Sequence, residues 1–345
     1  MIIISYILQK FKHILKNRKN YDIIIYGDNM IENLKFSLNA TMPVVLMMIF
    51  GYICKKTNLL DEHTTSKLNK FTFKAALPAL LFTDLSNADF KGVWDGKMVL
   101  FCVIVTLLSV GLAIVFSIFH KDKAERGEII QAAYRSSAAI LGIAFVKNIY
   151  GEITMAAMMI AGTVPIYNII AVAVLAATSP EKQGSSKKKL LIDTVKGVVN
   201  NPIIIGIFVG LCWSLLEIPQ PVIMSKTISY LGNMATPLAL IALGASFKVS
   251  EAKSKIGVTL GVTFIKLVLF CVIFLPAAIA LGFRDEKLVA ILIMLGSATT
   301  SSCYVMARNF SHRGTITAFA VMLTTIGSAF TLTTWLFLLK TFGVI

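Results

Sequence analysis

The chain has 345 residues, of which 56% are hydrophobic and 15% charged, and a formal net charge of +15. This composition, with a mean hydropathy of +0.77, excludes an ordinary soluble domain, which needs more charged residues to cover its surface. The positive charge does not indicate nucleic-acid binding, because Lys and Arg fall in short segments between apolar blocks, as the positive-inside rule produces in membrane proteins.

Residues 1–35 form a predicted N-terminal extension. The first 29 are rich in Lys, Asn, Ile and Tyr, and no block there is long enough to span a bilayer. A signal peptide is not expected, because no small-residue cleavage site follows an apolar core. Two explanations stay open: translation starts at Met30, or the stretch forms an interfacial amphipathic helix.

Apolar blocks of bilayer length then predict an all-α integral membrane protein with ten transmembrane helices. A spanning helix needs about 20 residues, and continuous apolar blocks favour helices over the alternating pattern of a barrel. The predicted spans are residues 38–54, 68–85, 98–119, 129–146, 154–177, 198–216, 228–247, 256–283, 288–307 and 316–339.

The ten predicted helices divide into two repeats of five, residues 36–177 and 198–345, joined by a basic cytoplasmic linker, residues 178–197. Pairs of Pro and Gly residues recur at an offset of 159 positions: Pro43 with Pro202, Gly51 with Gly210, and Pro78 with Pro237. Because each repeat has an odd number of helices, the second inserts upside down relative to the first. Such inverted repeats are typical of secondary transporters.

Predicted helices four and nine are the candidates for broken helices that cross at the centre of the membrane. Residues 135–142 and 296–304 are rich in Ser, Thr, Ala and Gly, which permit close backbone approach and can satisfy freed backbone groups. The N-terminus of a half-helix suits a carboxylate, whereas ordinary small-residue packing is the alternative. The candidate substrate contacts are Ser136, Ser137, Asn148, Thr299, Thr300 and Ser301.

The basic residues Lys74, Arg135 and Lys266 lie well inside predicted spans, where a charge costs about 2.5–3.5 kcal/mol at the helix centre. Lys74 and Arg135 are near enough to the cytoplasmic ends to snorkel. Lys266 lies ~15 Å into its span, which leaves a functional or counterion role open. We expect Lys266 or Arg135 to shape the potential around the substrate, and we include both among the substrate-binding candidates.

Acidic residues are nearly absent from the predicted spans, and Asp84 lies at a span end. Since cation pathways normally use buried carboxylates, this pattern favours an anionic substrate. It leaves coupling to H⁺ or Na⁺ open, because backbone carbonyls can bind Na⁺. No other cofactor is expected.

An enzyme is not expected, because the sequence contains no P-loop, no HExxH motif and no nucleophile elbow. The four histidines, His13, His63, His120 and His312, fall in predicted loops or the N-terminal extension, so no buried His base is expected. Five dispersed cysteines form neither a disulfide framework nor a zinc-ligand spacing.

The loops after odd-numbered helices carry 16 Lys and Arg residues, and the other loops with the C-terminus carry 7. This difference predicts that the odd-numbered loops are cytoplasmic and that both ends of the ten-helix unit face outward. We expect a multi-pass protein of the plasma membrane.

Several short motifs recur in a characteristic order: Met42-Pro43 with Gly51-Tyr52, then residues 76–82 (ALPALLF), 201–206 (NPIIIG), 236–240 (TPLAL) and 304–308 (YVMAR). With them, residues 36–340 resemble the auxin efflux carrier family, which includes bacterial malate and malonate permeases and the plant PIN-FORMED carriers. The resemblance implies two inverted five-helix repeats, a scaffold and a transport domain, crossing helices four and nine, and homodimers. Plant members have prolines at the crossing points, whereas residues 136–139 and 299–302 contain none.

Charge pattern and resemblance together predict a secondary active transporter of small organic anions, carboxylates such as malate, malonate or auxin-like acids, that works by alternating access. An anion channel and a membrane sensor of organic acids are the alternatives.

Overall fold

The computed structural model describes residues 20–87, 95–138, 146, 149–150, 154–182, 192 and 195–345. All regular structure within them is helical, apart from one isolated antiparallel bridge between Ser136 and Thr299. In chain order the principal helices are α2 (Asn20–Lys56), α3 (Glu62–Phe71), η1 (Thr72–Ala76), α4 (Leu77–Ser86), α5 (Gly96–Ile118), α6 (Arg126–Tyr134), α8 (Thr154–Thr178), η3 (Pro180–Lys182), α10 (Pro202–Leu215), α11 (Val222–Asn233), α12 (Ala235–Ser246), α13 (Val249–Ser254), α14 (Ile256–Phe264), η4 (Ile265–Leu269), α15 (Phe270–Ala280), α16 (Asp285–Gly296), α17 (Ser302–Asn309) and α18 (Thr315–Thr341).

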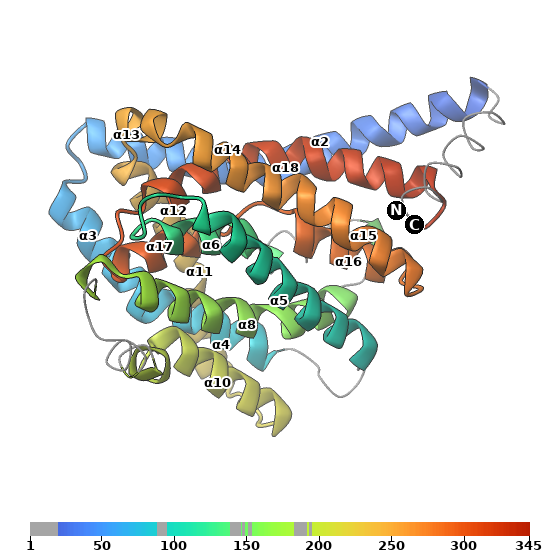
Figure 1. Ribbon diagram of the computed structural model, residues 1–345. Coiled ribbons are helices and arrows are strands. Elements are labelled where there is room, and N and C mark those ends of the chain that lie inside the picture. The colour runs from blue at the N-terminus through green and yellow to red at the C-terminus, as the bar shows by residue number, and fades with distance from the viewer. Residues whose placement is uncertain are drawn as a thin grey trace.

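Six helical stretches in the described part of the chain are long and apolar enough to cross a membrane, and Figure 1 shows the long helices lying side by side along one direction of the molecule. They are residues 34–56, 96–118, 158–178, 222–246, 256–280 and 315–341. The six overlap predicted spans one, three, five, seven, eight and ten.

The remaining predicted spans are shorter or interrupted. Helix α10 has 14 residues. The stretch α3–η1–α4 contains a π-helical turn, α6 ends at Tyr134, and α16 ends at Gly296, before α17 begins at Ser302. The first helix begins well before residue 38, since α2 is already helical at Asn20.

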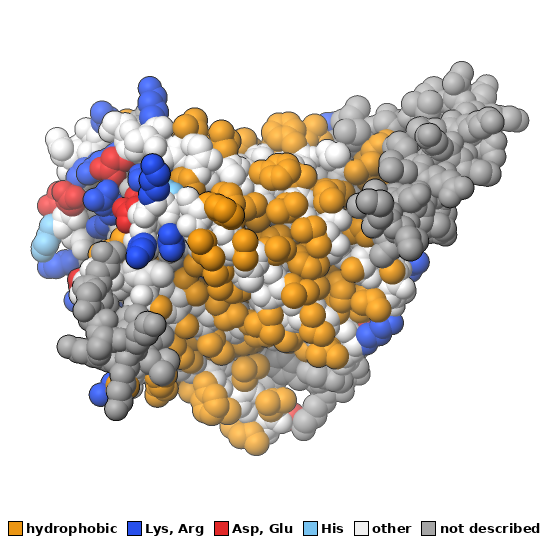
Figure 2. Space-filling model, viewed as in Figure 1, with side chains coloured by type: hydrophobic (Ala, Val, Ile, Leu, Met, Phe, Trp, Pro, Cys, Tyr) orange, Lys and Arg blue, Asp and Glu red, His pale blue; other side chains and the backbone are white. Residues whose placement is uncertain are grey.

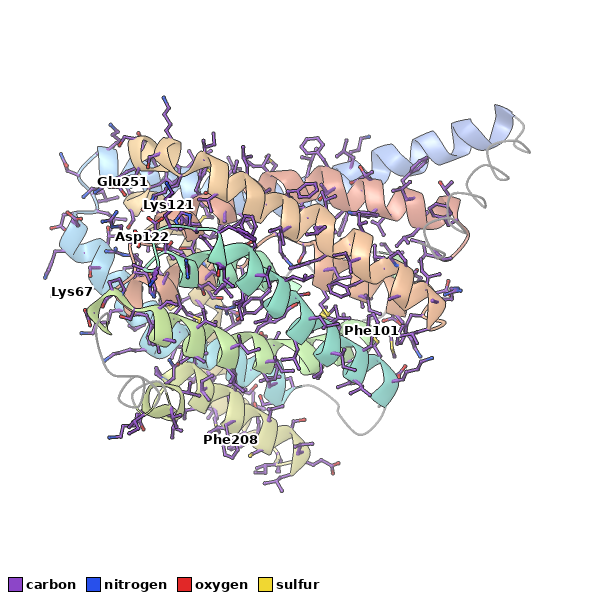
Figure 3. All side chains as sticks on the ribbon, in the orientation of Figure 1. Lys67, Phe101, Lys121, Asp122, Phe208 and Glu251 are labelled. Atoms are coloured by element: carbon purple, nitrogen blue, oxygen red, sulfur yellow. The ribbon has the colours of Figure 1, made fainter. Side chains whose placement is uncertain are left out.

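Hydrophobic side chains cover the middle of the molecule, and charged side chains gather at one end of it (Figure 2). Figure 3 places Lys67, Lys121, Asp122 and Glu251 together at that end, and Phe208 on the outer face of α10. Large apolar side chains such as Leu100 and Ile104 are about half exposed on α5. An apolar belt with a charged end is the surface that a membrane-spanning protein requires.

Two helix pairs pack backbone to backbone through glycine. A Cβ on Gly51 of α2 would lie 2.9 Å from Cα of Ile241 on α12, and one on Gly210 of α10 would lie 3.1 Å from Cα of Phe82 on α4. The two contacts are related by a single sequence offset, because Gly210 follows Gly51 by 159 positions and Ile241 follows Phe82 by 159. The glycine lies in the first half of the chain in one contact and in the second half in the other. One packing arrangement thus occurs twice, built from equivalent positions with their order reversed.

We expect Gly51→Ala to lower the melting temperature (Tm) of the purified protein, because the added methyl group must push α2 away from α12. Overpacking of this kind costs about 1–3 kcal/mol. Gly210→Ala should have a smaller effect of the same sign, since its contacts are slightly longer. Gly111→Ala is the matched control: Gly111 is also in a membrane-spanning helix, α5, but a Cβ there meets no atom of the described residues within 4 Å. Equal Tm values for Gly51→Ala and Gly111→Ala would contradict the close approach.

Candidate functional site

The candidate site lies where two helices end inside the molecule. Helix α6 ends at Tyr134, and Arg135 is extended (φ −78°, ψ 118°). Helix α16 ends at Gly296, and Ser297 is extended (φ −78°, ψ 165°). The interruption after α16 coincides with the predicted break at 296–304. The break predicted at 135–142 begins at its expected position, and residues 139–145 lie outside the described part.

The two extended segments pair with each other. The Ser137 amide donates to the Ala298 carbonyl (2.8 Å), as part of the bridge between Ser136 and Thr299. The Thr299 amide donates to Thr324 Oγ1 on α18 (2.9 Å), and Thr299 Oγ1 donates to the Ala132 carbonyl (2.8 Å). Backbone groups released by the helix breaks are thus satisfied within the protein, as an apolar surrounding requires.

Arg135 is buried at this junction, with 2% of its surface exposed. Its Nη2 donates to Asn168 Oδ1 on α8 (2.9 Å) and to Ser302 Oγ at the start of α17 (3.0 Å). Its Nη1 lies 2.8 Å from Met306 Sδ and 3.4 Å from Gln131 Oε1. The predicted snorkelling of Arg135 is therefore wrong, because acceptors on α8 and α17 hold the guanidinium inside. Nε has no hydrogen-bond partner among the described residues.

Lys266 is also buried, with 0% of its surface exposed, in the π-helical turn η4. Its Nζ donates to the Leu295 carbonyl (2.9 Å) and to Ser136 Oγ, and lies 3.4 Å from the Met294 carbonyl. It therefore joins the end of α16 to the extended segment that follows α6. By contrast, the side chain of Lys74, in the other π-helical turn, is exposed.

A small cavity of about 60 Å³ lies against the junction. Of the predicted contacts, Arg135, Ser136, Ser137, Thr300 and Ser301 line it. Thr299 and Lys266 do not line this cavity: Thr299 pairs with Ser136 in the junction, and Lys266 contacts Ser136 Oγ and the Leu295 carbonyl. Asn148 lies outside the described residues. Helices α4, α8 and α12 complete the wall, with Leu77, Leu80, Leu81, Asp84, Val164, Tyr167, Asn168 and Thr236.

Asp84 and Asn168 are wall residues that the sequence did not single out as contacts. Asp84 was noted only as a span-end carboxylate, and it reaches the cavity because α4 ends beside the junction. No ion pair joins Asp84 to Arg135 in the described part of the chain. Asn168 lies one helical turn beyond Val164, whose carbonyl its Nδ2 contacts (2.9 Å), so that Oδ1 is presented to Arg135.

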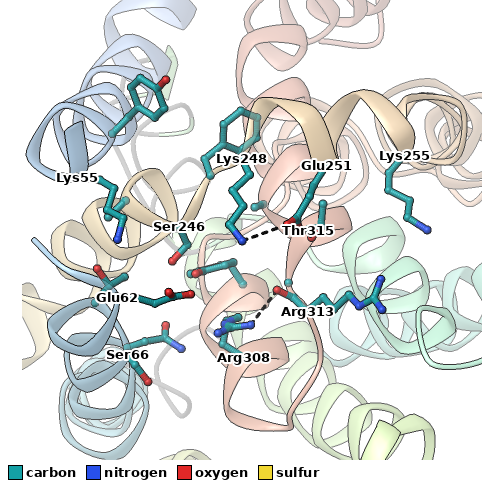
Figure 4. A pocket seen from close by; sticks show the side chains of 18 of the residues that line it. Lys55, Glu62, Ser66, Ser246, Lys248, Glu251, Lys255, Arg308, Arg313 and Thr315 are labelled. Atoms are coloured by element: carbon teal, nitrogen blue, oxygen red, sulfur yellow. Dashed lines mark hydrogen bonds and ion pairs between the residues drawn. The ribbon is translucent and has the colours of Figure 1, made fainter.

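A second cavity, of about 1010 Å³, opens at the charged end of the molecule, between α2, α3, α12, α13, α17 and α18 (Figure 4). Seven basic residues line it, against three acidic ones, Glu62, Glu125 and Glu251. The seven are Lys55, Lys56, Lys70, Lys248, Lys255, Arg308 and Arg313. A hydrogen bond from Lys248 lowers the pKa of Glu251, and Lys255 pairs with the buried carboxylate of Glu125 (2.7 Å). In the sequence, six of these seven basic residues, all except Lys70, served to predict the orientation of the protein in the membrane.

Two buried groups near this cavity correct the sequence expectations. Glu128 is 1% exposed and accepts hydrogen bonds from the amides of Gly314 (2.8 Å) and Thr317 (3.1 Å), which begin α18. His312 is 2% exposed, with its ring nitrogens 2.8 Å and 3.0 Å from the carbonyls of Ala124 and Leu175. The expected lack of interior carboxylates and of buried histidines is thus wrong at these positions, because free backbone groups at helix ends need partners.

Comparison with known proteins identifies similar membrane transporters. A model of the family described as "Membrane transport protein" matches residues 36–336. An "Uncharacterized transporter" of Methanothermobacter thermautotrophicus is 25% identical over 210 residues, covering 60% of this chain and 67% of the relative. The "Uncharacterized transporter YfdV" of Escherichia coli K12 is 20% identical over 308 residues, covering 88% and 98%. A "Putative malonate transporter" of Rhizobium meliloti is 23% identical over 311 residues, covering 87% and 94%.

We expect Thr324→Val to destabilise the junction, because it removes the hydroxyl group that accepts from the Thr299 amide while keeping the volume of the side chain. A buried donor left without a partner costs about 1–3 kcal/mol, which a lower Tm would report. Thr324→Ser keeps the hydroxyl group and should retain most of the stability. A Val variant as stable as the Ser variant would show that this hydrogen bond does not hold the junction.

Proposed function

We propose that this chain, which belongs to the membrane transport protein family, is a secondary active transporter of small organic anions. The family match over residues 36–336 and the apolar helices establish a multi-pass membrane transporter. The substrate class is our inference: carboxylates such as malate, malonate or auxin-like acids. The relative named for malonate agrees with this class.

The observation that carries the proposal is the buried guanidinium of Arg135 on the wall of the small cavity. Its Nε has no partner among the described residues, and no acidic side chain forms an ion pair with it in the described part. A buried guanidinium is stabilised by an anion, and a carboxylate matches its planar fork of donors.

The N-terminus of α17 reinforces this preference for an anion. The helix starts at Ser302 beside Arg135, and the N-terminus of a helix carries a partial positive charge. Thr300 and Ser301, directly before it, line the same cavity and offer hydroxyl donors. We propose that one carboxylate binds between Arg135 and these residues, with Ser137 on the opposite segment.

The volume of the cavity limits which ligands can bind unless its walls move apart. At about 60 Å³ the cavity is far smaller than the roughly 300–1,000 Å³ of small-molecule sites, which suits a carboxylate group but not a complete dicarboxylic acid. The larger basic cavity at the charged end would attract anions toward the junction. We therefore propose that the walls separate to admit the substrate, as alternating access demands.

The exchanged glycine contacts support an architecture of ten helices in two inverted repeats, residues 36–177 and 198–345, with 178–197 as the linker. The pairing of the segments after α6 and α16 supports crossing broken helices four and nine. In this arrangement the basic loops and the large cavity face the cytoplasm, and both ends of the ten-helix unit face outward. We further propose the plasma membrane as location and a homodimer as assembly.

Purified protein should show a dose-dependent rise in Tm with one class of carboxylate, when mono- and dicarboxylates including malate, malonate and aromatic acids are screened. A ligand that binds only the folded state stabilises it in this way. Saturable uptake and counterflow of that anion in proteoliposomes would separate a carrier from a channel. Stabilisation by cations or neutral solutes alone would overturn the choice of substrate class.

Arg135→Gln should abolish the Tm response to the anion and reduce uptake at least tenfold, since loss of a charge-assisted bond to a buried anion costs about 1.5–3 kcal/mol. Lys226→Gln, which removes an exposed lysine on α11, is the control and should behave as the wild type. A Thr300→Val, Ser301→Ala double variant should also lose affinity. If that double variant takes up the anion as fast as the wild type, the segment before α17 is not part of the binding site.

A further inference from the structure

The carbonyl groups at the C-terminal end of α16 need hydrogen-bond donors, and Lys266 supplies them. The last carbonyls of a helix have no partner within it and carry a partial negative charge. Those of Met294 and Leu295 lie inside the protein, where water does not reach the buried residues around them. In transporters with broken helices, such half-helix ends and unwound carbonyls commonly coordinate a Na⁺ ion.

Here the ammonium group of Lys266 occupies that position. Nζ lies 2.9 Å from the Leu295 carbonyl and 3.4 Å from the Met294 carbonyl. Its third contact is Ser136 Oγ, which itself donates to the Met294 carbonyl and so accepts from Lys266. Three acceptors match the three protons of an ammonium group.

The same contacts connect the two extended segments. Ser136 belongs to the bridge with Thr299, so the charge of Lys266 acts on both sides of the junction at once. No acidic partner pairs with Lys266 in the described part, which leaves carbonyl and hydroxyl dipoles to solvate it. The lysine projects from a π-helical turn, an irregularity that is frequent at functional sites.

We propose that Lys266 is a resident cation that takes the place of an exchangeable metal ion at the junction, so that the transporter needs no bound Na⁺. Lys266 is a positioning residue: it holds the C-terminal end of α16 and Ser136 in the geometry that aligns Arg135 and the start of α17. This role rests on the proposed function only where it concerns transport, since the contacts themselves belong to the fold.

Lys266→Ala tests the proposal through Tm, without any organic anion. The substitution removes a part of the side chain that corresponds to propylammonium. The variant should therefore have a lower Tm than the wild type, and added propylammonium should raise that Tm in a saturable manner. The uncharged 1-propanol should not restore it. Lys74→Ala, which removes the exposed lysine of the other π-helical turn, should respond to neither probe.

Three results would overturn the proposal: recovery with 1-propanol as great as with propylammonium, a Lys266→Ala Tm equal to that of the wild type, or a rise in wild-type Tm with NaCl beyond that with choline chloride. If Lys266→Ala cannot be purified even with propylammonium, Lys266→Arg must melt closer to the wild type than Lys266→Met. The reverse order would also refute a charge-based role.

Wild-type uptake should be equal in sodium and choline media. If no transported anion is found, the proposed function is contradicted. The Tm results would still decide the role of Lys266.

Discussion

The fold depends on satisfying backbone groups where helices end inside an apolar protein. Helices α6 and α16 both stop there, and their free amides and carbonyls are satisfied by each other, by Thr324 and by Lys266. An unsatisfied backbone group costs several kcal/mol in such a medium. The Ser- and Thr-rich composition of these segments follows from this constraint, because hydroxyl groups supply partners without bulk.

The two buried cations have separate tasks despite their proximity to one junction. Lys266 contacts the carbonyls at the end of α16, whereas Arg135 lies on the wall of the cavity and keeps Nε unpaired among the described residues. A bound anion would therefore meet a guanidinium whose position is fixed by Asn168 and Ser302. Such preorganisation lowers the cost of binding, because few groups must be ordered when the ligand arrives.

The sequence predicted the helical class, the apolar blocks and the position of both interruptions, because hydropathy and small-residue composition are local signals. It did not predict that Arg135 is held inside, since this depends on acceptors 33 and 167 positions away. The burial of Glu128 and His312 was missed for the same reason: their partners come from other helix ends. Asp84 was known as a span-end residue, but its place on the cavity wall required the packing of α4.

The glycine contacts between α2 and α12 and between α4 and α10 have a mechanical consequence. Where two backbones touch, the carbonyl of one helix sits in the notch left by the missing side chain of the other, which resists sliding. Each of these two helix pairs should therefore behave as one rigid unit. Any rearrangement of the helices should then shift each pair as a whole and leave the register within the pair unchanged.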